Sequence, residues 1–210
     1  MYFKSRRDAG IKLAQLLLKY ENRSDVYILA LLRGGVPVAY EVSKRLNIPF
    51  DIFIVRKLGV PGQEELAMGA IASGGIEVLN QDVIKFLKIP DDEVKRIIDE
   101  ERRELENSER KYGSSLSYHN FTNSTVILID DGLATGASMR VAIKALRVLK
   151  SAKIVVAVPT APPETCSEFE DLTDEIVCVI TPQRFTGVGS WYEDFSQVSD
   201  DEVKELLVTR

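Results

Sequence analysis

Two adjacent carboxylates, Asp130 and Asp131, are the side chains of this sequence that are best placed to do chemistry. They follow four apolar residues at 126–129 and precede a loop of small residues at 132–138, which contains two glycines and two hydroxyl side chains. Glycines allow a tight turn and let an anion approach backbone N–H groups. The carboxylates could accept hydrogen bonds from sugar hydroxyls or hold a hydrated Mg²⁺ ion. The stretch therefore indicates a site for a phosphorylated ligand.

The elements on either side of this loop decide where its groups point. Residues 126–129, Val-Ile-Leu-Ile, are typical of a buried strand. After the loop, apolar residues recur at helical spacing, at Val141, Ala142, Ala145, Leu146 and Leu149. A strand, a loop and a helix in this order direct backbone N–H groups and a helix N-terminus toward one point, where an anion can bind.

Two more predicted strands end in charged or glycine-rich residues. The run at 26–32 leads into Arg33-Gly34-Gly35, and the run at 51–57 ends in Arg56-Lys57. The first lacks the GxGxxG pattern of dinucleotide sites, and either one alone could be a solvated turn. Because ligands of open α/β sheets bind at the carboxyl ends of the strands, we expect the three strand ends to form one polar crevice.

The rest of the chain predicts a doubly wound α/β fold. Buried parallel strands form near-continuous apolar runs, and such runs occur at 26–32, 51–57, 126–131, 153–158 and 175–180. We expect a Rossmann-like, mainly parallel five-stranded sheet with helices on both faces. Gly74-Gly75 predicts a β-hairpin over 66–79. The charged stretch 91–112, with its i,i+4 ion pairs, predicts a long and largely solvated helix.

The composition excludes several classes of function. A net charge of −5, from 27 basic and 32 acidic residues, argues against nucleic acid as a ligand. The apolar runs are far shorter than the roughly 18 residues that span a bilayer, and the start lacks an apolar signal core, so we expect a cytoplasmic protein without membrane contact. The single histidine, His119, is expected in a loop and argues against most histidine-based catalysis. Cys166 and Cys178 are expected to be reduced thiols.

The stretch 126–138 resembles the phosphoribosyl-pyrophosphate (PRPP) motif of type I phosphoribosyltransferases, in which an apolar strand, two acidic residues and a Thr-Gly-x-Ser/Thr loop follow one another. Further stretches resemble a group of these enzymes whose acceptor is unassigned: Arg-Gly-Gly-Val-Pro-Val-Ala at 33–39, Val-Arg-Lys-Leu-Gly at 55–59 and Trp-Tyr-x-Asp-Phe at 191–195. The resemblance covers most of the chain. It implies one domain over 1–210, with a cap from about 1–10 and 182–198 and a helical insertion at about 81–120.

The resemblance implies transfer of a phosphoribosyl group from PRPP to a nitrogen acceptor, with release of pyrophosphate and dependence on Mg²⁺. Asp130 and Asp131 would hold the ribose hydroxyls directly or through Mg²⁺, and with Arg56 and Lys57 they are the candidate catalytic residues. The candidates for the 5-phosphate are Ala134, Thr135, Gly136, Ala137 and Ser138, and those for pyrophosphate are Arg33, Gly34, Gly35, Arg56 and Lys57. The resemblance also implies a homodimer and a mobile loop at 58–65 that closes over the reaction.

The acceptor depends on fewer residues. Family members that act on 6-oxopurines carry an aspartate just before Thr-Gly, where this sequence has Ala134, so we expect hypoxanthine and guanine to be poor acceptors. Phe185, Trp191 and Tyr192 are candidates to stack on a planar base, or aromatic residues that pin the C-terminal segment to the core. Two alternatives remain open: a regulator that senses PRPP without turnover, and a protein that binds another phosphorylated ligand.

Overall fold

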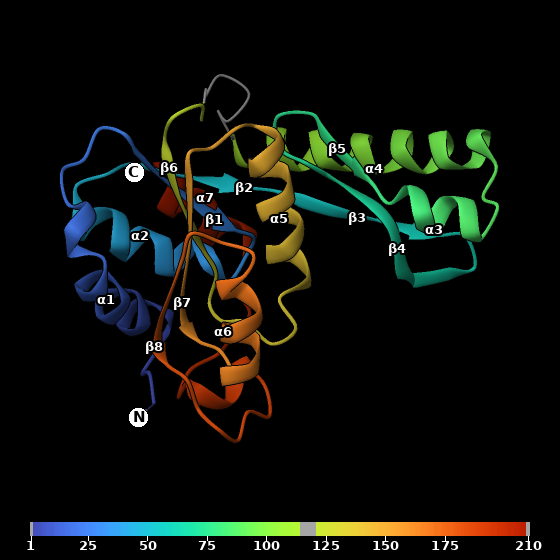
Figure 1. The fold of residues 1–210 in the computed structure, drawn as a ribbon. Helices are drawn as coiled ribbons and strands as arrows, with labels where there is room; N and C mark the ends of the chain where they lie inside the picture. The colour runs from blue at the N-terminus through green and yellow to red at the C-terminus, as the bar shows by residue number, and fades with distance from the viewer. Residues whose placement is uncertain (1, 114–120, 209–210) are drawn as a thin grey trace.

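The structure is a computed structural model that describes residues 2–113 and 121–208. At its centre lies a parallel sheet with the strand order β2-β1-β6-β7-β8 (Figure 1). These strands are β1 (Val26–Leu31), β2 (Phe50–Phe53), β6 (Thr125–Ile129), β7 (Lys153–Thr160) and β8 (Glu175–Ile180). From the central β1–β6 pair, β2 lies on one side and β7 and β8 lie on the other. The pair is therefore the topological switch point of a doubly wound sheet. The predicted fold class is confirmed.

Helices cover both faces of this sheet because its strands alternate apolar side chains between two cores. Ile127 and Ile129 pack with α1 (Arg6–Leu16) and α2 (Gly35–Leu46) on one face, while Val126 and Leu128 pack with α5 (Ala137–Val148) and α6 (Pro163–Glu170) on the other. Ser5 caps the start of α1, since its hydroxyl accepts a hydrogen bond from the N–H of Asp8. The short helix α7 (Asp200–Val208) packs on α2.

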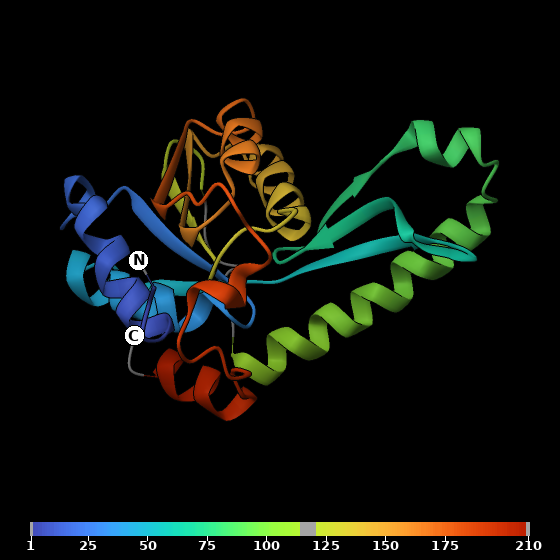
Figure 2. The same ribbon diagram turned by 90° about the horizontal axis from the view of Figure 1, so that it is seen from below.

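A long arm projects from this body (Figure 2). It consists of the antiparallel sheet β3 (Val55–Val60), β4 (Gln63–Ala72) and β5 (Ile76–Leu79), and of α3 (Gln81–Phe86) and α4 (Asp91–Tyr112). Residues 73–75 form the predicted hairpin turn, and α4 spans the predicted long helix. Within the described residues, no helix combines the length and hydropathy needed to cross a membrane. His119 lies outside the described residues.

Two predictions about the start of this arm are wrong. The strand expected at 51–57 is two strands in different sheets, and the loop expected at 58–65 is part of a β-hairpin with its turn at Pro61-Gly62. The parallel strand stops at Phe53 because its partner β1 stops at Leu31. The chain then pairs with the end of β4, where the N–H of Ser73 donates to the carbonyl of Ile54 at 2.8 Å. Arg56 and Lys57 therefore lie in the arm.

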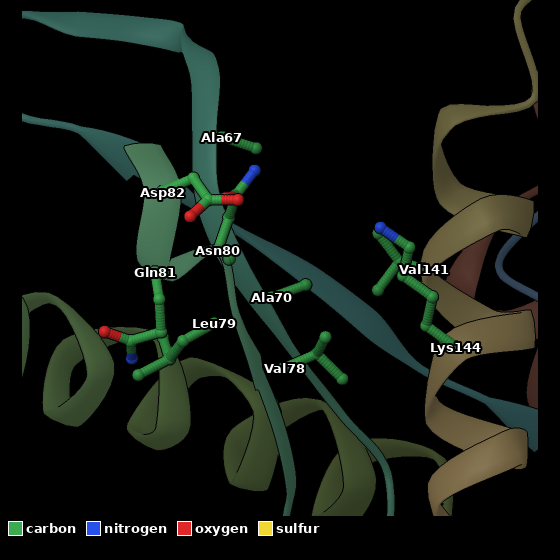
Figure 3. A pocket seen from close by; sticks show the side chains of 10 residues that line it. Ala67, Ala70, Val78, Leu79, Asn80, Gln81, Asp82, Val141 and Lys144 are labelled. Atoms are coloured by element: carbon green, nitrogen blue, oxygen red, sulfur yellow. The ribbon is translucent and has the colours of Figure 1, made fainter. Parts of the chain in front are cut away.

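The arm and the body enclose an open groove of about 400 Å³ (Figure 3). Ala67, Ala70 and Val78 of the arm sheet line one wall, and Val141 and Lys144 of α5 line the facing wall.

The two cysteines lie outside this groove, one in α6 and one in β8. Cys166 and Cys178 are free, with their Sγ atoms 3.3 Å apart. Burial raises the pKa of both thiols, and both cysteines are free, as expected.

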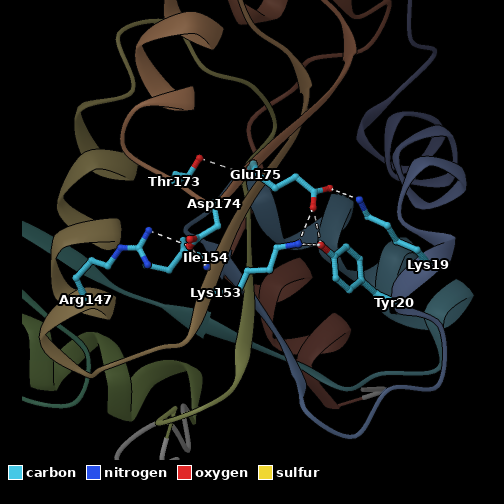
Figure 4. Close-up of polar contacts among 8 residues, drawn as sticks. All are labelled: Lys19, Tyr20, Arg147, Lys153, Ile154, Thr173, Asp174 and Glu175. Atoms are coloured by element: carbon cyan, nitrogen blue, oxygen red, sulfur yellow. Dashed lines mark hydrogen bonds and ion pairs between the residues drawn. The ribbon is translucent and has the colours of Figure 1, made fainter.

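At the amino ends of β7 and β8, a polar cluster joins the sheet to the segment that follows α1 (Figure 4). The Tyr20 hydroxyl donates to the Glu175 carboxylate at 2.7 Å, and the Lys153 ammonium lies 2.9 Å from both groups. Lys19 contacts the other Glu175 oxygen at 2.6 Å. Burial raises the pKa of Glu175, but the hydrogen bonds from these three donors outweigh it and lower the pKa to about 2.

We expect Glu175→Gln to destabilise the fold by about 1 kcal/mol near neutral pH, because it removes the charge that these donors share. The ionised carboxylate stabilises the fold above its usual pKa of 4.5, and this contribution is lost as the pH falls toward the folded pKa of about 2. Urea unfolding at several pH values measures the effect. Glu170→Gln, at an exposed position of α6, is the control. If Glu175→Gln and Glu170→Gln lower the free energy of unfolding by the same amount at pH 7 and at pH 3, the cluster does not stabilise the fold.

Candidate functional site

The two aspartates stand directly after β6, at the switch point of the sheet. Asp130 is densely surrounded by protein atoms, although part of its surface reaches solvent, and its Oδ1 accepts a hydrogen bond of 2.8 Å from the N–H of Asp131. Asp131 lies against the loop that follows β1, since a Cβ added to Gly34 would stand only 2.0 Å from its Oδ2. Glycine is required there because any side chain would displace the carboxylate. The structure thus brings the predicted aspartates and the predicted Arg33-Gly34-Gly35 loop together.

An arginine that the sequence did not single out completes the surroundings of Asp131. The Nε–H of Arg6 donates to Asp131 Oδ2 at 2.8 Å, and its Nη1 donates to the carbonyl of Ser196 at 2.7 Å. Its guanidinium also lies 3.9 Å from the centre of the Phe195 ring. A charge this well enclosed needs such partners. In the sequence, Arg6 is only one of several cations at the start of a helix, 125 residues from its partner.

Burial disfavours the state in which both aspartates are ionised. Desolvation raises the pKa of Asp130 well above its usual range, and the neighbouring Asp131 charge raises it further. Desolvation also raises the pKa of Asp131, while the hydrogen bond from Arg6 lowers it. Asp131 is therefore the member of the pair with its own counter-charge. A metal ion or the hydroxyls of a sugar would relieve the remaining cost of burial.

The small-residue loop has the geometry of an anion site. Gly136 has a φ of +68°, and a Cβ there would lie 2.5 Å from the Phe169 ring, so only glycine fits. The helix α5 begins at Ala137 without a side-chain cap, which leaves its first N–H groups for a ligand. Two hydrogen bonds fix the loop: the N–H of Leu133 donates to the Thr160 carbonyl, and the Thr165 hydroxyl donates to the Ala134 carbonyl at 3.0 Å.

The predicted pyrophosphate residues are divided between two places. Arg33 follows β1 at the switch point, after a cis peptide bond from Leu32. Its Nε contacts Asp200 Oδ1 at 3.0 Å, and the side chains of Lys111 and Tyr112 contact the same carboxylate. This group joins the body, the end of α4 and the start of α7.

Arg56 and Lys57 lie in β3 rather than at the end of a parallel strand. The Nε of Arg56 contacts Glu101 of α4 at 2.5 Å. The loops after β1 and β6 therefore lie side by side, as expected, whereas the expectation that Arg56-Lys57 end a parallel strand of the same sheet is wrong. The two cations stand at the base of the arm, and their role in binding stays a prediction.

The three aromatic residues that are candidates to contact the acceptor lie in different places. Trp191 stacks on Tyr2 with ring centres 5.6 Å apart, and Tyr192 packs between Phe3 and Phe195. Tyr192 also donates its hydroxyl to the Asp131 carbonyl at 2.5 Å. These two rings tie the chain ends to the body. Phe185 instead lines a cavity of about 360 Å³ next to the small-residue loop, together with Ala134, Pro162, Glu164, Gln183, Thr186 and Gly187.

Comparison with known proteins agrees with this geometry. Residues 4–194 match the family model of the phosphoribosyl transferase domain. The match includes both loops at the switch point and most of the chain, so the chain belongs to the phosphoribosyl transferase family.

Two groups of relatives cover nearly the whole chain. Two Mycobacterium tuberculosis sequences, whose names assign them provisionally to the phosphoribosyl transferases, are 40% identical over 98% of the chain. The chain spans about half of their length, since the aligned part is 46% of each relative. The crystal structure of TT1426 from Thermus thermophilus is 36% identical, covers 100% of this chain and 99% of its own, and has a TM-score of 0.85.

We expect Asp200→Asn to strengthen pyrophosphate binding. The Asp200 carboxylate pairs with Arg33 and so competes with the pyrophosphate for this side chain. Hydrogen bonds from Lys111 and Tyr112 lower the pKa of Asp200 to about 2, so it competes as a full charge near neutral pH. An exposed ion pair contributes little free energy, so its removal should raise the affinity for pyrophosphate by roughly two- to fivefold. Calorimetric titration with Mg²⁺-pyrophosphate measures it. Asp201→Asn removes the same charge one residue away, and equal affinities for the two variants would contradict the competition.

Proposed function

We propose that the protein transfers the 5-phosphoribosyl group of PRPP to a nitrogen acceptor and releases pyrophosphate. The observation that carries the proposal is the meeting of three features at one switch point. These are the buried aspartate pair, the Gly34 backbone packed against Asp131, and the uncapped start of α5. Together they suit the sugar, the pyrophosphate and the 5-phosphate of one ligand.

Each group has a separate task in the transfer. The N–H groups and hydroxyls at 134–138 bind the 5-phosphate and fix the ribose. Asp130 and Asp131 accept hydrogen bonds from the ribose hydroxyls and face the positive charge that develops at C1 as the pyrophosphate leaves. Arg33 and the backbone of Gly34 and Gly35 receive the leaving group. The acceptor nitrogen forms the new bond to C1 while the C1–O bond to pyrophosphate breaks, so positioning supplies most of the catalysis.

The donor set at the switch point fits a magnesium ion. Mg²⁺ is usually held by one or two carboxylates together with substrate phosphates and water. Within the described residues, no cluster of three or more His, Cys, Asp or Glu side chains could hold a metal by itself. Asp130 and Asp131 are therefore proposed to bind Mg²⁺ together with the ligand, directly or through water. Bound there, the ion would neutralise the charge of the departing pyrophosphate.

The function is tested by measuring pyrophosphate release from Mg²⁺-PRPP with adenine, guanine, hypoxanthine, cytosine, uracil and orotate. We expect release with at least one base and little with guanine or hypoxanthine, because Ala134 cannot exchange the proton of a purine N7. Efficient turnover of either 6-oxopurine would show that another group does so. Saturable PRPP binding without release for any base would instead support a PRPP-sensing regulator of the same fold.

Asp131→Asn is expected to lower turnover by about 10²-fold or more, since it removes a charge that faces the sugar in the transition state. The variant keeps an oxygen that can accept the Arg6 Nε–H, so we expect it to fold, with some loss of stability because Arg6 loses its counter-charge. The double variant Asp130→Asn, Asp131→Asn should lose activity further. Initial rates under saturating Mg²⁺-PRPP measure this, with Asp171→Asn on the exposed end of α6 as the control. Full activity and PRPP affinity in the double variant would disprove the assignment of the site.

A further inference from the structure

We propose that Glu164 is the residue by which this site selects its acceptor, and that it selects nitrogen heterocycles with an amino group over their oxo counterparts. The proposal rests on the proposed transfer and adds to it a substrate class and a residue. It follows from the cavity of about 360 Å³ that lies beside the small-residue loop.

The position of the cavity suits the acceptor. It is lined by Ala134, the residue that directly precedes Thr135 and Gly136 of the phosphate-binding loop. A ligand in it would therefore lie next to the ribose that this loop and the aspartates hold. Its volume falls in the range of small-molecule sites, about 300–1,000 Å³. Phe185, which is half-buried, lines the cavity with an aromatic ring, the kind of side chain that packs against planar ligands.

The helix that carries Glu164 is hydrogen-bonded to the phosphate-binding loop. Glu164 stands in the first turn of α6, next to Thr165, whose hydroxyl donates to the Ala134 carbonyl at 3.0 Å. This hydrogen bond ties α6 to the loop at the wall of the cavity. Glu164 is exposed, and within the part of the chain that the structure describes no ion pair engages its carboxylate. Its oxygens are therefore available to a ligand.

The chemistry of the lining determines which ligand fits. Glu164 is the one charged residue among those that line the cavity, and the other polar side chains are Gln183 and Thr186. An ionised carboxylate only accepts hydrogen bonds. In this proposal the carboxylate faces the exocyclic group of the base: an amino group there donates to it, whereas an oxygen there turns its lone pairs toward the negative charge and leaves only the neighbouring ring N–H to donate. The amide of Gln183 can donate or accept, so it tolerates both kinds of ring edge. Glu164 is therefore the lining residue that discriminates between amino and oxo heterocycles.

Neighbouring acidic residues of α6 offer matched controls. Glu168 pairs with Arg140 of α5, and Glu170 is exposed at the end of the helix; neither lines the cavity. Glu170→Gln removes one charge from the same helix and leaves the cavity unchanged. Glu164→Gln keeps the size of the side chain and replaces half of its accepting capacity by an N–H donor.

The experiment compares pairs of bases that differ by an amino and an oxo group: adenine with hypoxanthine, and cytosine with uracil. We expect wild type and Glu170→Gln to favour the amino member of whichever pair is turned over. In Glu164→Gln the ratio of kcat/KM, amino over oxo, should fall at least tenfold, with the change mainly in the KM of the base and the KM of PRPP unaltered. A preference of wild type for the oxo member, or an equal ratio in all three proteins, would overturn the role of Glu164.

Failure of the transfer itself has a different signature. If PRPP binds and no base releases pyrophosphate, the proposed function fails, and the same ratios are then measured as dissociation constants of the bases from the PRPP-loaded protein. A tenfold fall of the amino preference in Glu164→Gln would still support the cavity as a base site. Equal dissociation constants for amino and oxo bases in wild type, or an unchanged ratio in the variant, would overturn the proposal.

Discussion

The burial of two adjacent carboxylates at the end of the central strand is the constraint on which the rest of the site depends. Asp130 and Asp131 stand where β1 and β6 diverge, and desolvation raises the pKa of both. A pair of this kind persists only if the fold supplies compensation. The compensation comes from Arg6, and the contact of Arg6 with Ser196 and Phe195 draws the C-terminal segment over the same edge. Arg6 therefore links the charge of Asp131 to the C-terminal segment.

A second ionic group relates the arm to the site. Asp200 gathers Arg33 from the body with Lys111 and Tyr112 from the end of α4, the helix whose other half supports the arm sheet. Arg56 at the base of that sheet contacts the same helix through Glu101. An anion that draws Arg33 away from Asp200 would leave this carboxylate to Lys111 and Tyr112 of α4.

Local patterns were enough to predict much of this structure. The strand, loop and helix around Asp130, the Arg33-Gly34-Gly35 turn and the long charged helix 91–112 are encoded in consecutive residues, and all three are found where the sequence placed them. The break between β2 and β3 was missed because an apolar run does not reveal where its partner strand ends. Arg6 and Asp200 were missed because their contacts are made across the fold, and nothing in their local sequence separates them from other surface charges.

The central claim is that one ligand, PRPP, spans the switch point from the start of α5 to Arg33. A crystal structure of the chain with PRPP and Mg²⁺ tests it most directly. We expect the 5-phosphate within hydrogen-bond distance of the N–H groups at 134–138, the ribose hydroxyls at Asp130 and Asp131, and the pyrophosphate at Arg33 and Gly34. Binding of PRPP at another place, such as the groove between the arm and α5, with the 134–138 loop empty, would contradict the claim.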